Sequence, residues 1–306
     1  MSDSPDPTTL ADAARKQLGP TGIWLSSLGG QSAAVEREAA AELDQLGYRA
    51  LWFGETPRNK EAFVHAGLLL GATERLVIAT GIANIWARDA AATHQAANTL
   101  GEAYPGRFVL GLGVSHAPLV DSRGHSYRRP LAAMTQYLDA LDAAEYAPPL
   151  PAQPVPLVLA ALRQRMLELS RDRTAGAHPY LTTVEHTAQA RELLGQGPLL
   201  APEVTVVLER DPQRAREIAR PFLAGYIAMS NYVNNWRELG FNDEDLADGG
   251  SDRLVDALVG WGDEEAVLAR VRAHHEAGAD HVAIQPLGSF EESMAQLRAL
   301  APALVA

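Results

Sequence analysis

The 306-residue chain contains no cysteine. It therefore has no disulfide bonds, no thiol nucleophile and no cysteine-ligated zinc site, and we expect a cytoplasmic protein. No apolar run reaches the length of about 20 residues that a membrane-spanning helix needs, and the N-terminus lacks the pattern of a signal peptide. We therefore expect no interaction with a membrane.

Positive charge is also scarce. The chain has 26 Lys and Arg against 38 Asp and Glu, and its formal net charge is −12. This negative net charge argues against nucleic acid as a partner, although the chain can still have a local basic patch. We expect a small molecule as the ligand. Hydrophobic residues make up 47% of the chain, which is typical of a globular protein. We expect one domain over residues 1–306, with a flexible tail at residues 1–9.

The motifs of several enzyme classes are missing. The sequence has no Walker motif, no His-Glu-x-x-His zinc motif and no Gly-x-Ser-x-Gly nucleophile turn, so a hydrolase with an activated nucleophile has little support. The nine histidines are scattered, and the adjacent His274 and His275 point to different faces of a helix. We therefore expect no metal site.

What the sequence does contain is a regular alternation of short apolar segments and helical segments. Eight segments predict strands, at residues 22–25, 50–53, 76–80, 108–112, 155–160, 176–180, 203–208 and 281–285. Eight strands that alternate with helices over about 250 residues predict a (β/α)8 TIM barrel of the α/β class. A doubly wound open sheet is the alternative.

The connection between the seventh and eighth predicted strands is the longest, at about 70 residues, whereas a barrel needs only one helix there. We therefore predict a helical insertion, with helical segments over residues 212–275. Within residues 225–246, polar and aromatic residues such as Tyr226, Asn231 and Tyr232 alternate. This mixture indicates a lid or an interface, and a solvated extra helix is the alternative.

The fourth predicted strand ends in the segment RFVLGLGVSH, residues 107–116. Gly111 and Gly113 interrupt the apolar run, and Ser115 and His116 follow it. Ligands bind at the C-terminal ends of parallel strands, so His116 is a candidate acid or base near neutral pH. A loop histidine with a structural hydrogen bond is the alternative. His178, near the end of the sixth predicted strand, is a second candidate.

Two further turns follow predicted strands. Gly81 permits unusual backbone geometry beside a ligand, and Asn84 offers donors and acceptors, although an ordinary turn would explain both. Thr182 and Glu185 have the spacing of a capping box, which predicts a helix start there. The free N–H groups of that helix start would suit a phosphate, although most capping boxes only cap.

Arginines follow the third, fourth and fifth predicted strands. On an acidic protein, basic residues on one face would attract an anionic ligand, and solvated ion pairs are the alternative. These arginines are Arg88, Arg123, Arg128, Arg129, Arg163 and Arg165.

The chain resembles the luciferase-like monooxygenase superfamily and, within it, the coenzyme F420-dependent oxidoreductases of actinobacteria. The matching segments are LGYRALWFGE (46–55), ATGIANIWARDA (79–90), GRFVLGLGVSH (106–116) and AGADHVAIQPL (277–287). The segment NYVNNWRELGF (231–241) is similar to an uncharacterised subgroup. The resemblance covers residues 22–301 and implies a TIM barrel with the tricyclic ring of the cofactor at its C-terminal mouth.

The resemblance also implies roles for individual residues. A non-prolyl cis peptide between Gly81 and Ile82 would lie behind the ring, and Asn84 would contact the ring system. Phosphate binding would involve the stretch from Tyr180 to Thr183. The further cofactor contacts that we expect are Gly113, Ser115, His178, Tyr180, Thr182 and Thr183.

This sequence departs from the dehydrogenases of the superfamily at two places. Those relatives have an acidic residue and a histidine after the second strand, where this chain has Glu55 and Thr56. A glutamate after their fourth strand is His116 here. Their catalytic residues cannot be transferred as a set, so we expect His116 first and Glu55 second in proton transfer.

The resemblance implies an F420-dependent oxidoreductase that moves a hydride between C5 of the deazaflavin and a small organic substrate. An FMN-dependent monooxygenase that uses reduced flavin and O2 is the first alternative. A non-catalytic protein that binds flavin or deazaflavin is the second. Relatives are commonly dimers, so we expect a homodimer.

Overall fold

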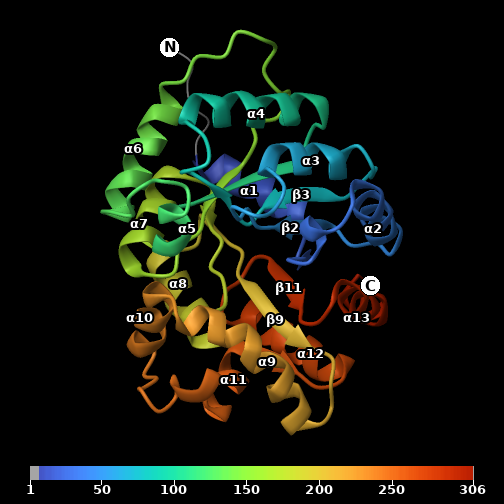
Figure 1. The fold of residues 1–306 in the computed structure, drawn as a ribbon. Helices are drawn as coiled ribbons and strands as arrows, with labels where there is room; N and C mark the ends of the chain where they lie inside the picture. Colours follow the sequence, from blue (N-terminus) through green and yellow to red (C-terminus); the bar gives the residue numbers. More distant parts are fainter. Residues whose placement is uncertain (1–6, 306) are drawn as a thin grey trace.

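The computed structural model describes residues 7–305 of the chain. Helix α1 (Pro7–Leu18) begins within the stretch predicted as a flexible tail, residues 1–9. Residues 1–6 of the chain lie outside the described part. The remaining elements form one parallel sheet surrounded by helices (Figure 1).

The strands of the sheet run in the order β10-β9-β11-β1-β2-β3-β5-β6-β7-β8, and each pairs with its neighbours in parallel. Their bounds are β1 (Thr21–Trp24), β2 (Ala50–Phe53), β3 (Val77–Thr80), β5 (Phe108–Gly113), β6 (Leu157–Leu159), β7 (Gly176–Ala177), β8 (Leu199–Leu200), β9 (Glu203–Val207), β10 (Val259–Trp261) and β11 (Val282–Pro286).

The sheet closes on itself between β8 and β9, which are separated by two residues. The N–H of Ala201 donates to Ala177 O at 2.9 Å on one side, and the N–H of Ala283 donates to Pro202 O at 3.0 Å on the other. The segment from β8 to β9 is thus the seventh barrel strand. The predicted TIM barrel is confirmed, and the open sheet is not adopted.

Three short strands lie outside the predicted set, and one of them is β8, which precedes the predicted seventh strand at residues 203–208. Strand β4 (Ala83–Asn84) pairs with β5 just past the end of β3. Strand β10 pairs with β9 inside the segment that we predicted as helical, so that prediction is wrong for Val259–Trp261. The helices of this segment are α9 (Pro212–Ile227), α10 (Ser230–Glu238), α11 (Asp252–Leu258) and α12 (Glu264–Glu276).

Most of the remaining helices begin at side-chain caps. Ser32 accepts a hydrogen bond from the N–H of Val35 at the start of α2, and Asp89 accepts from Ala92 at the start of α4. The remaining helices are α2 (Ala33–Gln45), α3 (Ala62–Leu70), α4 (Ala90–Ala103), α5 (Ala117–Asp121), α6 (Pro130–Asp142), α7 (Gln164–Arg173), α8 (Val184–Leu194) and α13 (Phe290–Leu304). Figure 1 shows α9, α10 and α11 together on one side of the barrel, with α4 and α6 on the opposite side.

Helix α1 fills the N-terminal end of the barrel. Its apolar residues Ala11, Ala14 and Leu18 form one buried cluster with interior residues such as Trp52 and Val109. A larger apolar cluster packs the outer face of the strands against the surrounding helices. Because α1 fills the interior from the N-terminal end, the cavity opens at the C-terminal mouth.

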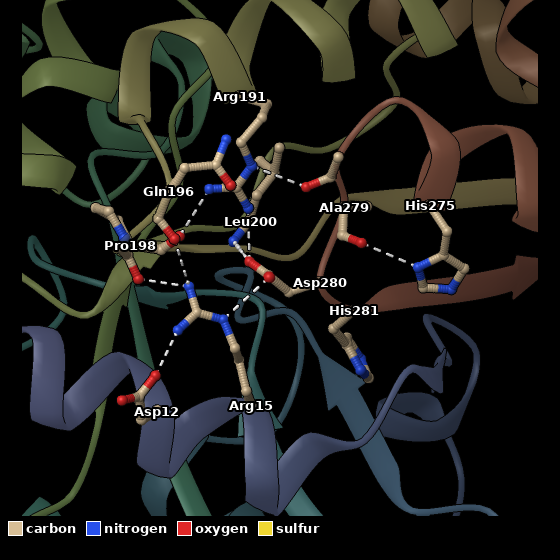
Figure 2. A network of polar contacts seen from close by, with 12 residues as sticks. Asp12, Arg15, Arg191, Gln196, Pro198, Leu200, His275, Ala279, Asp280 and His281 are labelled. Carbon is tan, nitrogen blue, oxygen red and sulfur yellow. Dashed lines mark hydrogen bonds and ion pairs between the residues drawn. The ribbon is translucent and has the colours of Figure 1, made fainter.

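An ionic network holds α1 in place (Figure 2). Asp280, just before β11, accepts from Arg15 Nε of α1 at 3.0 Å and from Arg191 of α8 at 2.6 Å. Its Oδ2 also accepts from the N–H of Leu200 in β8 at 2.8 Å. A single carboxylate therefore joins α1, α8 and β8 at the closed end of the barrel.

Candidate active site

A cavity of about 1730 Å³ opens at the C-terminal ends of the strands. Seven of the residues expected from the sequence line it. They are Glu55, Gly81, Ile82, Ser115, His116, His178 and Tyr180. All seven follow barrel strands, and we call this surface the strand wall. Other residues that line the cavity belong to the insertion. They are Tyr226, Met229, Asn231 and Tyr232, and we call them the insertion wall.

Four expected cofactor contacts do not line the cavity, namely Asn84, Gly113, Thr182 and Thr183. Asn84 is fully buried, and its Oδ1 accepts from the N–H of Trp86 at 3.0 Å. A Cβ on Gly113 would lie 2.5 Å from a side-chain carbon of Ile82, so Ile82 covers this glycine. Both residues support the wall from behind.

The predicted capping box at Thr182 is wrong by one residue. Thr183 is the N-cap of α8, and its side chain accepts from the N–H of His186 at 3.2 Å. Thr182 is buried, and its hydroxyl has no hydrogen-bond partner within residues 7–305. This helix start therefore lies beneath the surface rather than on the cavity.

The backbone between Gly81 and Ile82 is cis, as the resemblance implied. A Cβ on Gly81 would lie 2.6 Å from Trp24 Nε1 and 2.9 Å from His178 Nε2, so only glycine fits between these rings. Both nitrogens are buried and lack a hydrogen-bond partner among the described residues. The strand wall therefore combines a close backbone approach with one unused donor and one unused ring nitrogen.

The protonation of His178 follows from its neighbours. Its Nδ1 lies 2.6 Å from the carbonyl oxygen of Ala201, which can only accept, so Nδ1 carries the hydrogen and Nε2 a lone pair. Burial lowers the pKa of His178 to about 4, so the ring is neutral at pH 7. The ring also stacks on Trp52 at 4.3 Å between centroids, which fixes its plane.

Glu55 is held on both of its oxygens. Its Oε2 accepts from the N–H of Asn84 at 2.8 Å, and its Oε1 pairs with the guanidinium of Arg88. Arg88 also pairs with Glu61 at 2.6 Å. Glu55 thus ties the turn after β2 to the turn after β3, and its carboxylate is a fixed, compensated charge in the wall.

His116 stands at the turn between β5 and α5, where it is the N-cap residue of α5. Its Nδ1 lies 3.1 Å from Oδ1 of Asn231 in α10, and its ring lies 5.4 Å from the ring of Tyr232. Burial lowers its pKa, and the hydrogen bond to Asn231 opposes that shift. A neutral imidazole in the cavity can accept or deliver a proton.

The insertion wall contacts the strand wall through tyrosines. The hydroxyl of Tyr226 donates to that of Tyr180 at 3.0 Å, and Tyr180 donates to Gln285 Oε1 at 2.9 Å. Trp236 is fully buried behind this wall. Sequence reasoning marked Tyr226, Asn231 and Tyr232 as part of a lid or interface. It missed Trp24, whose position at the end of the first strand was the available signal.

Basic side chains surround the cavity. Arg129, Arg163 and Arg165 of the predicted group line it, as does Arg58, whereas Arg88, Arg123 and Arg128 do not. Arg163 pairs with Glu238. Among the ion pairs and side-chain hydrogen bonds of residues 7–305, none involves Arg58, Arg129 or Arg165, and all three are exposed. Unpaired positive charge at the mouth favours an anionic ligand.

Within the described part of the chain, no group of three or more His, Asp or Glu residues is placed to hold a metal ion. No helix between residues 7 and 305 is long and apolar enough to cross a membrane.

The family model of the luciferase-like monooxygenases matches residues 17–281. The chain belongs to the luciferase-like monooxygenase family. The matched range includes both walls of the cavity, so the expectation of a luciferase-like enzyme is confirmed at the level of the family.

Two curated relatives are similar to this chain. A 5,10-methylenetetrahydromethanopterin reductase of Methanolobus tindarius is 24% identical over 61% of this chain and 65% of its own length. A Mycobacterium tuberculosis protein with the provisional name coenzyme F420-dependent oxidoreductase is 23% identical over 72% of this chain and 60% of its own. The chain thus spans less than two thirds of the length of either relative.

Solved structures share the fold of this luciferase-like protein. The coenzyme F420-dependent tetrahydromethanopterin reductase of Methanopyrus kandleri has a TM-score of 0.74 and 14% identity, covering 93% of this chain and 99% of that one. An FMN complex of the oxygenating constituent of 3,6-diketocamphane monooxygenase from Pseudomonas putida has a TM-score of 0.70 and 12% identity, covering 94% and 97%. At these identities the likeness shows the fold alone.

Proposed function

We propose that this luciferase-like protein is an F420-dependent oxidoreductase that transfers a hydride between the deazaflavin and a small organic substrate. The observation that carries the proposal is the presence of three unpaired arginines, Arg58, Arg129 and Arg165, in the lining of the cavity. They occur in a protein with a net charge of −12. A cofactor with a long, acidic tail would neutralise this local excess. The curated relative with the provisional name coenzyme F420-dependent oxidoreductase supports the same choice.

The residues present fit such a cofactor. The cavity of about 1730 Å³ is larger than most small-molecule sites, which suits a tricyclic ring with an extended tail. Gly81 and Ile82 line the cavity on the strand wall, where the lack of a side chain on Gly81 lets its backbone lie against Trp24 and His178. The unpartnered Trp24 Nε1 and His178 Nε2 offer a donor and an acceptor to polar atoms of a ring. The arginines at the mouth would hold the phosphate and carboxylates of the tail.

When bound, the deazaflavin supplies hydride exchange at its carbon C5. The protein supplies position and proton transfer. Gly81 and Ile82 orient the ring, while Tyr226 and Tyr232 on the insertion wall exclude water from the other side. His116 takes the proton from the substrate when hydride leaves it, or returns the proton in the opposite direction. Glu55, whose negative charge is paired with Arg88, holds the turn after β2 against the turn after β3, behind the ring.

A parallel titration of the cofactor-free protein with F420 and with FMN tests the cofactor. We expect F420 to bind with micromolar or tighter affinity and FMN at least about tenfold more weakly, because FMN presents fewer negative charges to the arginines. The combined variant Arg58→Gln, Arg129→Gln and Arg165→Gln is expected to remove most of the preference. Tighter binding of FMN, or binding of neither compound, contradicts the proposal.

His116→Ala tests the proton-transfer role. We expect turnover to fall by about 10²- to 10⁴-fold while the affinity for the cofactor stays within about twofold, because only the reacting proton loses its partner. His125→Ala is the matched control, since His125 is an exposed histidine nine positions further along the same connection and does not line the cavity. Unchanged turnover of His116→Ala at saturating substrate would remove His116 from the mechanism.

The second candidate is an FMN-dependent monooxygenase that uses reduced flavin and O2. The fold that this chain shares with an FMN complex of a monooxygenase favours it. Oxygen uptake that depends on reduced FMN, in the absence of F420 turnover, would select this candidate.

A further inference from the structure

Asn231 and His116 form a hydrogen bond across the cavity between the insertion and the barrel. His116 follows β5, and Asn231 is the second residue of α10, 115 positions later. Both residues line the cavity. Asn231 is therefore the contact through which the insertion reaches the candidate acid–base group directly.

The partner atom decides which nitrogen of His116 carries the hydrogen. Oδ1 of Asn231 is a carbonyl oxygen and can only accept, and it lies 3.1 Å from Nδ1 of His116. Nδ1 must then donate, so in the neutral ring Nε2 holds the lone pair. The nearby ring of Tyr232, at 5.4 Å between centroids, restricts rotation of the imidazole.

We propose that Asn231 is a positioning residue, which holds His116 as the Nδ1–H tautomer so that Nε2 is the atom that accepts or delivers the proton. The inference rests on the proposed function, in which His116 moves the proton. It adds that the acid–base group is complete only when helix α10 is docked.

The docking of α10 is well defined. Trp236 and Tyr232 on this helix are buried, and Trp236 Nε1 donates to Leu181 O at 3.5 Å, just past the end of the sixth barrel strand. The Tyr226–Tyr180 hydrogen bond joins the preceding helix α9 to the same strand end. Movement of α10 away from the barrel would therefore separate Asn231 from His116.

The other titratable groups of the cavity are neutral near pH 7, paired, or exposed at the mouth. The phenols of Tyr127, Tyr180, Tyr226 and Tyr232 have raised pKa values because they are buried, so they stay neutral near pH 7. The carboxylates of Glu55 and Glu238 are paired with Arg88 and Arg163. The remaining cavity cations are the exposed arginines at the mouth, Arg58, Arg129 and Arg165. Burial lowers the pKa of His116, and the hydrogen bond with Asn231 is the interaction that counteracts this shift.

The test is an NMR pH titration of the full-length, cofactor-free protein with ¹⁵N-labelled histidine, in which the His116 signals are assigned by their loss in His116→Ala. In the wild type we expect the Nδ1–H tautomer. Asn231→Ala should abolish that preference and lower the pKa of His116. Asn231→Asp should raise the pKa by about one unit or more, because a carboxylate stabilises the imidazolium.

Asn234 provides the matched control, because it is the same residue type on the same helix and is exposed. Asn234→Ala and Asn234→Asp should leave the tautomer and the pKa of His116 unchanged. In turnover assays, Asn231→Ala should reduce kcat by about 10- to 100-fold without changing the cofactor affinity, and Asn231→Asp should shift the pH profile upward.

The outcomes separate this inference from the proposed function. If Asn231→Ala and Asn231→Asp leave the His116 tautomer and pKa unchanged, the positioning role of Asn231 is wrong even where His116→Ala abolishes turnover. If the NMR changes occur as expected but His116→Ala turns over normally, the hydrogen bond exists and the catalytic role of both residues is wrong. Asn231→Asp preserves the size of the side chain, so it gives a result even if the alanine variant unfolds.

Discussion

The two walls of the cavity are built by different forces. The residues of the strand wall directly follow β2, β3, β5 and β7, whose backbones are fixed by parallel pairing around a closed barrel. The insertion wall is held to the barrel by side-chain contacts, such as the Tyr226–Tyr180 and His116–Asn231 hydrogen bonds. A wall fixed by the sheet holds its residues in place, which suits the proposed cofactor. A wall fixed by side chains can change from one protein to another, so we expect it to determine the substrate.

The largest expected effect tests the barrel beneath the strand wall. Glu203 is fully buried and accepts hydrogen bonds from Thr205 Oγ1 at 2.7 Å and the N–H of Leu181 at 2.8 Å, and burial raises its pKa to about 7. Between its usual pKa of 4.5 and about 7 the folded chain binds more protons than the unfolded chain. The free energy of unfolding should therefore fall as the pH rises through this window, by about 3 kcal/mol in total.

Glu203→Gln removes this titration while keeping a side chain that can form both hydrogen bonds. The stability of the variant relative to wild type should therefore increase by about 3 kcal/mol between pH 4.5 and pH 8, as measured by urea unfolding at each pH. Glu38→Gln, at an exposed position on α2, should show no such trend. A pH-independent difference for Glu203→Gln would show that this carboxyl does not make the barrel pH-dependent.

The barrel was predictable because each barrel strand is a short apolar run between polar or glycine-containing turns. Strand β2 has the predicted bounds, and most of the others differ by one or two residues at an end. Strand β10 was missed because Val259–Trp261 follows α11 directly and contains a glycine, so its three residues give no strand pattern. Its strand geometry comes from pairing with β9, which lies about 50 residues earlier in the chain.

The candidate site was predictable only in part. Position at a strand end identified Gly81, His116 and His178, because the ends of parallel strands meet at one mouth. The same reasoning could not tell that Ile82 covers Gly113 or that Asn84 turns inward, because side-chain direction depends on packing. The partnership of His116 with Asn231 joins residues 115 positions apart and leaves no local signal in the sequence.

A pair of glycine substitutions compares the two walls directly, with a smaller expected effect. At Gly81 a Cβ would lie within 3 Å of Trp24 Nε1 and His178 Nε2, so Gly81→Ala should lower the free energy of unfolding by about 1–3 kcal/mol and weaken cofactor binding. Gly225 lies in α9 with open space around its Cβ position. Gly225→Ala should therefore stabilise the protein by about 0.5–1 kcal/mol, since alanine favours the helix.

Urea unfolding and cofactor titration of the two alanine variants give the measurement. Opposite signs for the two changes in stability would support the view that the strand wall is tightly packed at Gly81. They would also support the view that α9, beside the insertion wall, has open space at Gly225. A destabilised Gly225→Ala together with a tolerated Gly81→Ala would reverse the comparison of the two walls.

The smallest expected effect concerns the ion pair that joins the walls at their rim. Arg163, before α7, pairs with Glu238 at the end of α10, and both side chains are about half exposed, at 51% and 53%. Solvent screens such a pair, so Arg163→Ala should lower the free energy of unfolding by less than about 1 kcal/mol. A double-mutant cycle with Glu238→Ala, measured at low and high salt, isolates the pairwise contribution. A coupling above about 2 kcal/mol that persists in high salt would show that the rim, and not the buried contacts of Trp236 and Tyr226, fixes the insertion wall to the barrel.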